Sequence, residues 1–358
     1  MRVPNRSMPS PAPTLYPLPT VNAHPETKLQ SASGGRRSAA CQPALAAFAW
    51  GAFVWIFFII YKGAFTTSIG AGMVFPDWPL SNGSLNPAGW LQDQDMLAEH
   101  GHRLTAGVMT ILCVVLAIWL HLREARAWLR RLGWAALALV FFQAFVGGLR
   151  VLLDHLHVEM VNTSVGRLFA MGHACLAQLF LCTIAAIAVA CSRPWIERRA
   201  GLRAAPTAGL RGFALLCLGL LFAQLAIAAV MRHSFAGMAI PTFPHSTPEG
   251  SLLPANWSFG VGIQFAHRVM AAVLTLALLG LAASIWRSRS APGAMRLGAG
   301  ALLFLLSLQI FLGAATVLSG RSPYYATWHV IVGAGLLVTT FLITWVLHRD
   351  QVDSAPAA

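Results

Sequence analysis

Eight long apolar stretches, separated by polar connections, run along the chain. They lie near 45–65, 101–121, 132–152, 168–191, 211–231, 262–286, 297–319 and 325–347. A helix of about 20 apolar residues crosses the ~30 Å of hydrocarbon in a bilayer. Backbone polar groups in lipid must be bonded within the segment, which favours helices. The pattern predicts an all-α integral membrane protein with eight transmembrane helices, and long continuous apolar runs are not typical of a membrane β-barrel.

The composition supports this prediction and excludes other classes of protein. The 358 residues are 57% hydrophobic and only 10% charged, whereas a soluble domain carries about 25% charged residues. Only six cysteines occur among the 358 residues, which excludes a disulfide-rich scaffold. An ordinary soluble enzyme is excluded as well.

The net charge of +13 could indicate a nucleic-acid partner, but its distribution indicates topology instead. Of the 25 Lys and Arg residues, 18 precede the first span, follow the last, or lie in the even-numbered connections. The stretch 66–99 on the other side has four acidic residues and no Lys or Arg. The positive-inside rule then places both termini in the cytoplasm of a bacterial-type cell membrane. We expect a disordered cytoplasmic leader at 1–44, a cytoplasmic tail at 349–358 and no nucleic acid.

An internal duplication organises the chain. Matching motifs recur in the same order at nearly constant offsets: Ala-Gly-Met-x-x-Pro-x-x-Pro at 71–79 and 236–244, His-Arg at 102–103 and 267–268, and Gln-x-Phe-x-Gly at 143–147 and 309–313. Repeats of this kind define the architecture. They predict two tandem four-helix bundles, 45–195 and 208–348. Because each unit has an even number of spans, the repeat is parallel, about an axis along the membrane normal.

Four histidines occupy repeat-matched positions close to the outer ends of their spans: His102, His173, His267 and His329. Each unit therefore has one pair on two different helices. A zinc site normally needs three or four ligands, whereas a haem iron takes two axial ligands within a bundle. Haem bound by two His in each half is the simplest interpretation, and a structural hydrogen-bonding role is the alternative. The remaining His, including His100, are expected in solvent or at the interface.

The neighbours of these histidines suggest further roles. Arg103 and Arg268 directly follow their His and could pair with haem propionates, or extend to the interface. Glu99 precedes His102 by three residues, and Gln264 takes its place in the second half. A carboxylate can exchange protons or hold positive charge, so the first unit is the expected place of chemistry. The alternative is an acid that only caps its helix.

The Glu-x-x-His-Arg at 99–103, the Gln-x-x-His-Arg at 264–268, the single His in spans four and eight and the Pro-Asp-Trp-Pro at 76–79 resemble the haem A synthases. The resemblance covers both units but not the leader. It implies an oxidoreductase that oxidises the C8 methyl of haem O to a formyl group by successive hydroxylations, in cytochrome oxidase assembly.

The resemblance also assigns roles to the candidate residues. The iron of the substrate haem O would lie between His102 and His173, with Arg103 beside it. His267 and His329 would ligate the iron of a haem b cofactor, with Arg268 beside it. Glu99 would be the catalytic carboxylate. An unidentified electron acceptor, haem O synthase and cytochrome oxidase assembly factors would be partners, within the lipid bilayer.

Two observations leave alternatives open. Some family members carry a Cys pair in an outside loop, and no outside loop of this chain has a Cys. A two-haem membrane electron carrier would also need four His on helices, and a haem transporter could use them transiently. The electron carrier has less reason to pair Glu99 with Gln264. The connection holding His155 and His157 is about ten residues longer than its counterpart, and its role is open.

Overall fold

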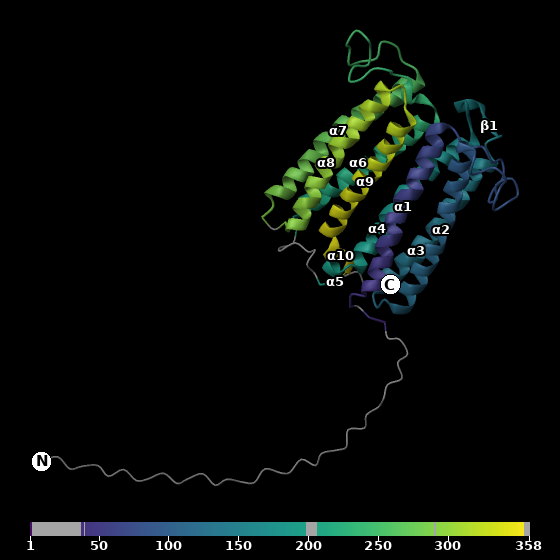
Figure 1. Cartoon of the computed structure of the whole chain (residues 1–358). Helices are drawn as coiled ribbons and strands as arrows, with labels where there is room; N and C mark the ends of the chain where they lie inside the picture. The colour runs from purple at the N-terminus through teal and green to yellow at the C-terminus, as the bar shows by residue number, and fades with distance from the viewer. Residues whose placement is uncertain (2–36, 39, 198–205, 290, 354–358) are drawn as a thin grey trace. The chain divides into compact units, whose positions relative to one another are not determined.

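The computed structural model describes residues 1, 37–38, 40–197, 206–289 and 291–353 (Figure 1). Eight helices in these residues are long and apolar enough to cross a membrane: α1 (Pro43–Ile69), α2 (Gln94–Arg123), α3 (Ala127–Leu152), α4 (Val165–Cys191), α6 (Ala208–His233), α7 (Phe259–Arg287), α8 (Gly293–Leu318) and α9 (Pro323–Leu347). The eight predicted spans are confirmed, and the chain is a multi-pass membrane protein. Most of the predicted leader, 1–44, lies outside the described residues. Ser38 pairs with the connection between α2 and α3, and Pro43 begins α1.

Short polar residues and prolines determine where these helices begin. Pro43 and Pro323 occupy the first positions of α1 and α9, where the missing N–H costs nothing. The side chain of Asp93 accepts from two backbone N–H groups of the first turn of α2, and Ser258 caps α7 similarly. Gly70 ends α1 in the left-handed conformation, at φ 84°, which glycine adopts without steric cost. The helices extend beyond the apolar stretches because these caps lie in the polar connections.

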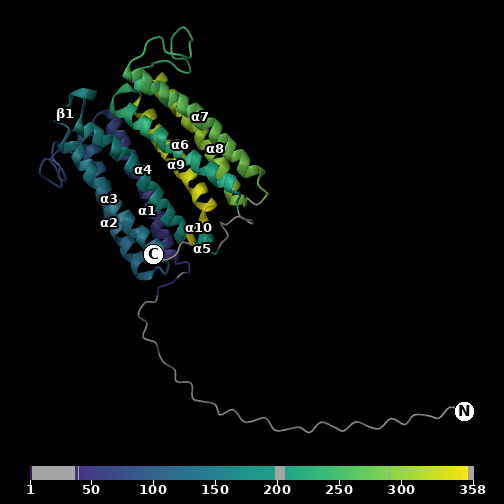
Figure 2. The same cartoon turned by 180° about the vertical axis from the view of Figure 1, so that it is seen from behind.

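The helices form two bundles (Figures 1 and 2). In the first, α1 packs on α2, α2 on α3, α3 on α4, and α4 closes the ring on α1. In the second, α6, α7, α8 and α9 close in the same order. The bundles meet through α1 with α9, α4 with α6, and α4 with α9. If α1 corresponds to α6 and α4 to α9, a two-fold rotation exchanges the first two contacts and preserves the third. The packing is therefore compatible with the predicted parallel repeat.

The C-terminal ends of the two central helices, α4 and α9, are joined by a cluster of aromatic residues. Helices α4 and α9 are the most buried of the eight. The short α5 (Arg193–Ile196) follows α4 and buries Trp195 completely. Trp195 stacks on Trp345 with ring centroids 6.0 Å apart. Arg349, which begins α10 (Arg349–Asp353), donates to the Trp195 carbonyl oxygen and lies 5.0 Å above its ring. The start of the predicted tail is thus packed against the protein.

The longer connection between α3 and α4 forms a small hairpin. It contains β1 (His157–Val158), the 3-10 turn η1 (Glu159–Val161) and β2 (Thr163–Ser164), with β1 and β2 paired antiparallel. Across the described residues these two-residue strands are the exception to the all-α prediction. His155 and His157 are exposed on it. In the described part of the second unit, the connection between α6 and α7 contains the short turn η2 (Ala236–Met238).

We predict that Trp195→Ala lowers the stability of the detergent-solubilised protein by about 3–5 kcal/mol, because it leaves a cavity where both bundles meet. Trp134→Ala is the matched control, since Trp134 is 44% exposed on α3, and exposed substitutions usually change stability by about 0.5 kcal/mol or less. Thermal unfolding followed by circular dichroism measures both. Equal shifts in the midpoint would contradict a structural role for Trp195.

Candidate functional site

The four predicted histidines lie at nearly the same distance from the starts of their helices. His102, His173 and His267 are each the ninth residue of α2, α4 and α7, and His329 is the seventh of α9. All four helices run in the same direction within the alternating bundles. The histidines therefore form one layer, with a pair in each bundle.

Glycines on the neighbouring helices make room for three of the four rings. Gly63 faces His102, Gly147 faces His173 and Gly313 faces His329. A Cβ atom added at the glycine would lie 2.9 Å from the Cε1 atom of the ring in the first two pairs and 3.0 Å from it in the third. Real Cβ atoms are not found this close, so any larger residue would displace the ring. Sequence reasoning missed Gly63. Gly147 and Gly313 belong to the repeated Gln-x-Phe-x-Gly motif, and the structure shows that each one faces an imidazole ring.

The rings of His173 and His329 are oriented by matching hydrogen bonds. The Nδ1 of His173 lies 3.1 Å from the carbonyl oxygen of Gln143, and the Nδ1 of His329 lies 3.1 Å from that of Gln309. A carbonyl oxygen only accepts, so Nδ1 must carry the proton. The lone pair of a neutral ring is then on Nε2, the arrangement common in metal-binding histidines.

In the second bundle the two rings face one another. The centroids of His267 and His329 are 6.4 Å apart and their planes are inclined by 64°. Amide nitrogens lie beside their Nε2 atoms, Gln224 at 3.4 Å from His267 and Gln309 at 3.2 Å from His329. Two metal–imidazole bonds of about 2 Å each, together with the half-widths of the two rings, span a similar distance. Among the described residues no three His, Cys, Asp or Glu form a metal cluster, so this pair suits a group that takes two protein ligands.

In the first bundle the corresponding pair lies near a third basic residue. His173 and Arg150 both act electrostatically on His102. The position equivalent to Gln224 is Ile59, so His102 has no matching amide beside it. The Nδ1 atoms of His102 and His267 are alike, because both are buried without a hydrogen-bond partner in the described part of the chain. The two histidine pairs therefore differ in their surroundings although their positions match.

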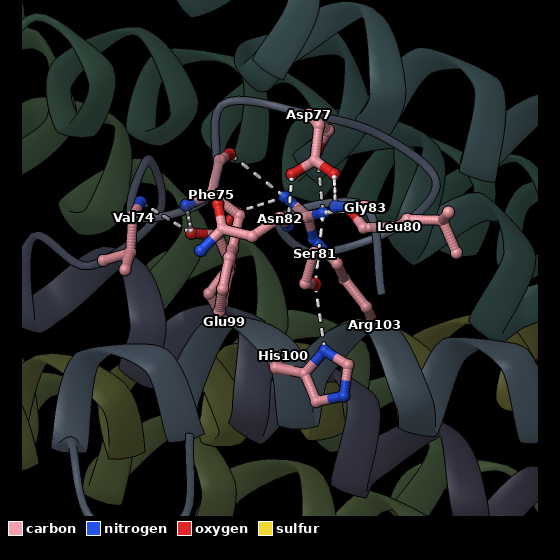
Figure 3. Close-up of polar contacts among 10 residues, drawn as sticks. All are labelled: Val74, Phe75, Asp77, Leu80, Ser81, Asn82, Gly83, Glu99, His100 and Arg103. Carbon is pink, nitrogen blue, oxygen red and sulfur yellow. Dashed lines mark hydrogen bonds and ion pairs between the residues drawn. The ribbon is translucent and has the colours of Figure 1, made fainter. Parts of the chain in front are cut away.

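Glu99 anchors the loop between α1 and α2, which covers the end of the first bundle nearest the histidine pair (Figure 3). One carboxylate oxygen accepts from the backbone N–H groups of Val74 at 2.7 Å and Phe75 at 3.1 Å. The other forms an ion pair with Arg103 at 2.6 Å. Glu99 is 4% exposed, so this carboxylate is buried and every contact stabilises its charge.

Arg103 completes the anchor from the same helix. Its guanidinium also donates to the backbone carbonyl oxygens of Phe75, Asp77 and Leu80. Four of its five N–H groups are thereby engaged, leaving only Nε–H. The loop is thus held to α2 by hydrogen bonds between its backbone and the side chains of Glu99 and Arg103, which are themselves joined as an ion pair.

The second bundle repeats the anchor without the charge. The Gln264 side chain accepts from the Ile240 backbone N–H at 2.5 Å and donates to the Gly237 carbonyl oxygen at 2.9 Å. Arg268 donates to the carbonyl oxygens of Ile240, Thr242 and His245. Ile240 is 165 residues after Phe75, the same offset that separates Gln264 from Glu99. The one chemical difference in this anchor is the carboxylate of Glu99.

His100 is a correction to the sequence prediction. It was expected in solvent or at the interface, but it is 3% exposed. Its Nδ1 lies 2.9 Å from Ser81 Oγ, and its ring meets that of Trp90 edge-on at 4.7 Å. The tight turn after Ser81 brings the loop back over α2, which the linear sequence does not show. His100 therefore holds the loop in place.

Asp77 closes the tip of the same loop. Its carboxylate accepts from the backbone N–H groups of Asn82 at 2.8 Å and Gly83 at 2.7 Å. Partial burial alone would raise the pKa of Asp77, but these two N–H groups outweigh it and hold that pKa below its usual value. The next residue, Trp78, packs its indole against Gly148 of α3. The Pro-Asp-Trp-Pro run thus closes the loop and rests it on the bundle.

We predict that Arg103→Gln loosens its loop more than Arg268→Gln loosens the other. The first change leaves the buried Glu99 carboxylate without its cation, at a cost of about 3–5 kcal/mol. The second leaves only neutral carbonyl groups, at about 1–3 kcal/mol. Hydrogen exchange of the loop amides, 74–84 against 239–249, measures the loss of protection. Equal loss in the two loops would show that the ion pair adds nothing to the anchor.

Comparison with known proteins agrees with this geometry. The family profile described as "Cytochrome oxidase assembly protein" matches residues 46–341. A protein named "Heme A synthase" from Halalkalibacterium halodurans is 25% identical over 306 residues, covering 82% of this chain and 93% of the relative. One of the same name from Sphingopyxis alaskensis is 26% identical over 353 residues, covering 86% and 92%. The chain belongs to the haem A synthase family of cytochrome oxidase assembly proteins.

Proposed function

We propose that this protein converts haem O to haem A by oxidising the C8 methyl group to a formyl group through successive hydroxylations. The observation that carries the proposal is a His pair in each bundle at one depth, with a buried carboxylate beside only one pair. Relatives of similar length are named for haem A synthesis, and this chain covers more than nine-tenths of two of them.

The second bundle is the proposed haem b site. His267 and His329 would be the axial ligands, and their separation of 6.4 Å fits two bonds to one metal ion. The Gln309 carbonyl oxygen fixes the His329 ring with Nε2 as its lone-pair atom. A haem bound here would supply one-electron redox chemistry tuned by its axial ligands and surroundings. Arg268 holds the covering loop and keeps two N–H groups for a carboxylate of the cofactor.

The first bundle is the proposed substrate site. His102 and His173 would hold the iron of haem O, with His173 oriented by the Gln143 carbonyl oxygen. The loop anchored by Glu99 and Arg103 would cover this pocket on its outer side and limit access of water. Haem O is itself apolar enough to arrive from the bilayer, so a covered outer face is compatible with its delivery.

Glu99 is the proposed catalytic carboxylate. Two backbone N–H groups and Arg103 keep its oxygens charged and fixed one helical turn from His102. A fixed anion of this kind stabilises positive charge that develops beside it and needs no reorganisation during the reaction. Both of its oxygens already accept hydrogen bonds in the anchor, which favours this electrostatic role over proton transfer.

The topology is part of the proposal. The units 45–195 and 208–348 would be the substrate and cofactor bundles, with both termini in the cytoplasm. The basic connections then lie inside and the histidine layer lies near the outer face. Electrons removed from the substrate would pass to an acceptor outside this chain, and assembly partners would meet it within the membrane.

We predict that Glu99→Gln abolishes most haem A formation while haem b stays bound. Removing one preorganised electrostatic group costs about 100-fold or more in rate. The full-length protein is co-expressed with a haem O source, and the extracted haems are separated by chromatography. Haem O or a hydroxylated intermediate should accumulate in the variant.

Glu124→Gln is the matched control for this prediction. Glu124 is also buried and paired with an arginine, Arg126, at 2.9 Å, but it lies at the inner end of α2. It should leave the haem profile unchanged. If the wild-type protein yields only haem b, with both His pairs occupied, the synthase proposal fails and a two-haem electron carrier becomes the better interpretation.

We predict that substitutions of the two glycines that face His173 and His329 affect different haem sites. Gly147→Ala should displace His173 and weaken the substrate site, and Gly313→Ala should displace His329 and release haem b, since overpacking costs about 1–3 kcal/mol. Gly219→Ala on α6, where an added Cβ meets nothing within 4 Å, is the control. Haem content and the absorption bands of bis-histidine haem measure each effect. Loss of both haems from either variant would contradict independent sites.

A further inference from the structure

Arg150 lies at the outer end of the first bundle, close to the histidine pair. It is three residues after Gly147 on α3, so both are on the same face of the helix, and Gly147 seats the His173 ring. Its guanidinium lies beneath the covering loop, against Gly72: a Cβ added there would lie 2.9 Å from Arg150 Cζ. Arg150 acts electrostatically on both His102 and His173. It is therefore placed between the histidine pair and the loop.

This guanidinium has no hydrogen-bond or ion-pair partner among the described residues, and Arg150 is half-buried near the end of α3. The two nearest carboxylates are already engaged, Glu99 by Arg103 and Asp154 by the Ser164 hydroxyl. Glu99 and Asp154 act on Arg150 only at a distance. A half-buried charge without a bonded partner is costly. The site therefore favours an anion.

Two other arginines near these helix ends, Arg103 and Arg232, are committed elsewhere. Arg103 has one N–H group left after bonding the loop, so it cannot form a two-pronged contact with a carboxylate. Arg232 donates to the Ala64 carbonyl oxygen at 2.7 Å and to Ser68 Oγ at 2.8 Å, across the contact between the bundles. In the second bundle, Thr316 occupies the position equivalent to Arg150. A free guanidinium at this position is thus specific to the first bundle.

We propose that Arg150 binds a carboxylate of the tetrapyrrole substrate held between His102 and His173. A haem carries propionate groups at one edge, and a guanidinium matches a carboxylate with two parallel hydrogen bonds. The macrocycle would then be oriented with its propionate edge toward Gly72 and the outer loop. Arg103 keeps its role in anchoring that loop. This inference rests on the proposed substrate site, but not on the reaction performed there.

The test compares a ligand with its carboxylates and without them. Full-length protein carrying haem b is titrated with haem O and with haem O dimethyl ester, and binding is followed by absorbance. Arg150→Gln should weaken haem O binding by about 10- to 100-fold, the value of a charge-assisted hydrogen bond. It should leave ester binding unchanged. Arg150→Lys should fall in between, because lysine keeps the charge but loses the two-pronged geometry.

Arg321→Gln is the control, because it removes the same charge from an exposed arginine in the outer loop between α8 and α9. It should bind both ligands as the wild type does. Unchanged haem b bands show that each variant is folded, and if Arg150→Gln does not accumulate, Arg150→Lys provides the comparison. The inference is overturned if Arg150 variants weaken both ligands equally or neither, or if the wild type binds acid and ester alike. The titration measures binding and does not depend on the reaction. If the protein binds haem O more tightly than the ester but forms no haem A, the synthase proposal fails and the Arg150 proposal stands.

Discussion

A polar imidazole inside an apolar bundle is the constraint on which the rest of the structure depends. Such a ring must find a hydrogen-bond partner and space within a layer that contains neither water nor loops. For His173 and His329, a backbone carbonyl oxygen of the neighbouring helix is the partner and a glycine of the same helix provides the space. The hydrogen bond at Nδ1 leaves Nε2 as the nitrogen with the free lone pair in the neutral ring. Solving the burial problem therefore also prepares a ligand.

The outer loops follow from the same layer of residues. Each begins after the first helix of its bundle and is fastened to the second by a side chain three residues before its histidine and an arginine directly after it. Loop and histidine thus share one rigid segment of helix. A conformational change in the loop would be transmitted to the ring within a single turn.

Duplication gives two similar sites, and a few substitutions make them different. The first bundle has Glu99 where the second has Gln264, so its loop anchor is charged and not neutral. It also has Arg150 where the second has Thr316, which adds a cation without a bonded partner among the described residues. Gln224 adds an amide beside His267 only in the second half. The first histidine pair therefore has the more strongly charged surroundings, which suits the proposed substrate site, and the second pair has the more neutral surroundings, which suits the proposed haem b site.

The sequence by itself determined the eight spans, the repeat and the four histidines, because apolar length, motif offsets and intramembrane polar residues are local or periodic signals. It also predicted the asymmetry at Glu99. Only the tertiary structure decided that Gly63 faces His102, that Arg103 serves the loop, that His100 is buried, and that Arg150 is left without a bonded partner. These depend on how loops fold back over helices and on which helix faces meet. Such contacts join residues far apart in the chain, and no pattern along the sequence encodes them.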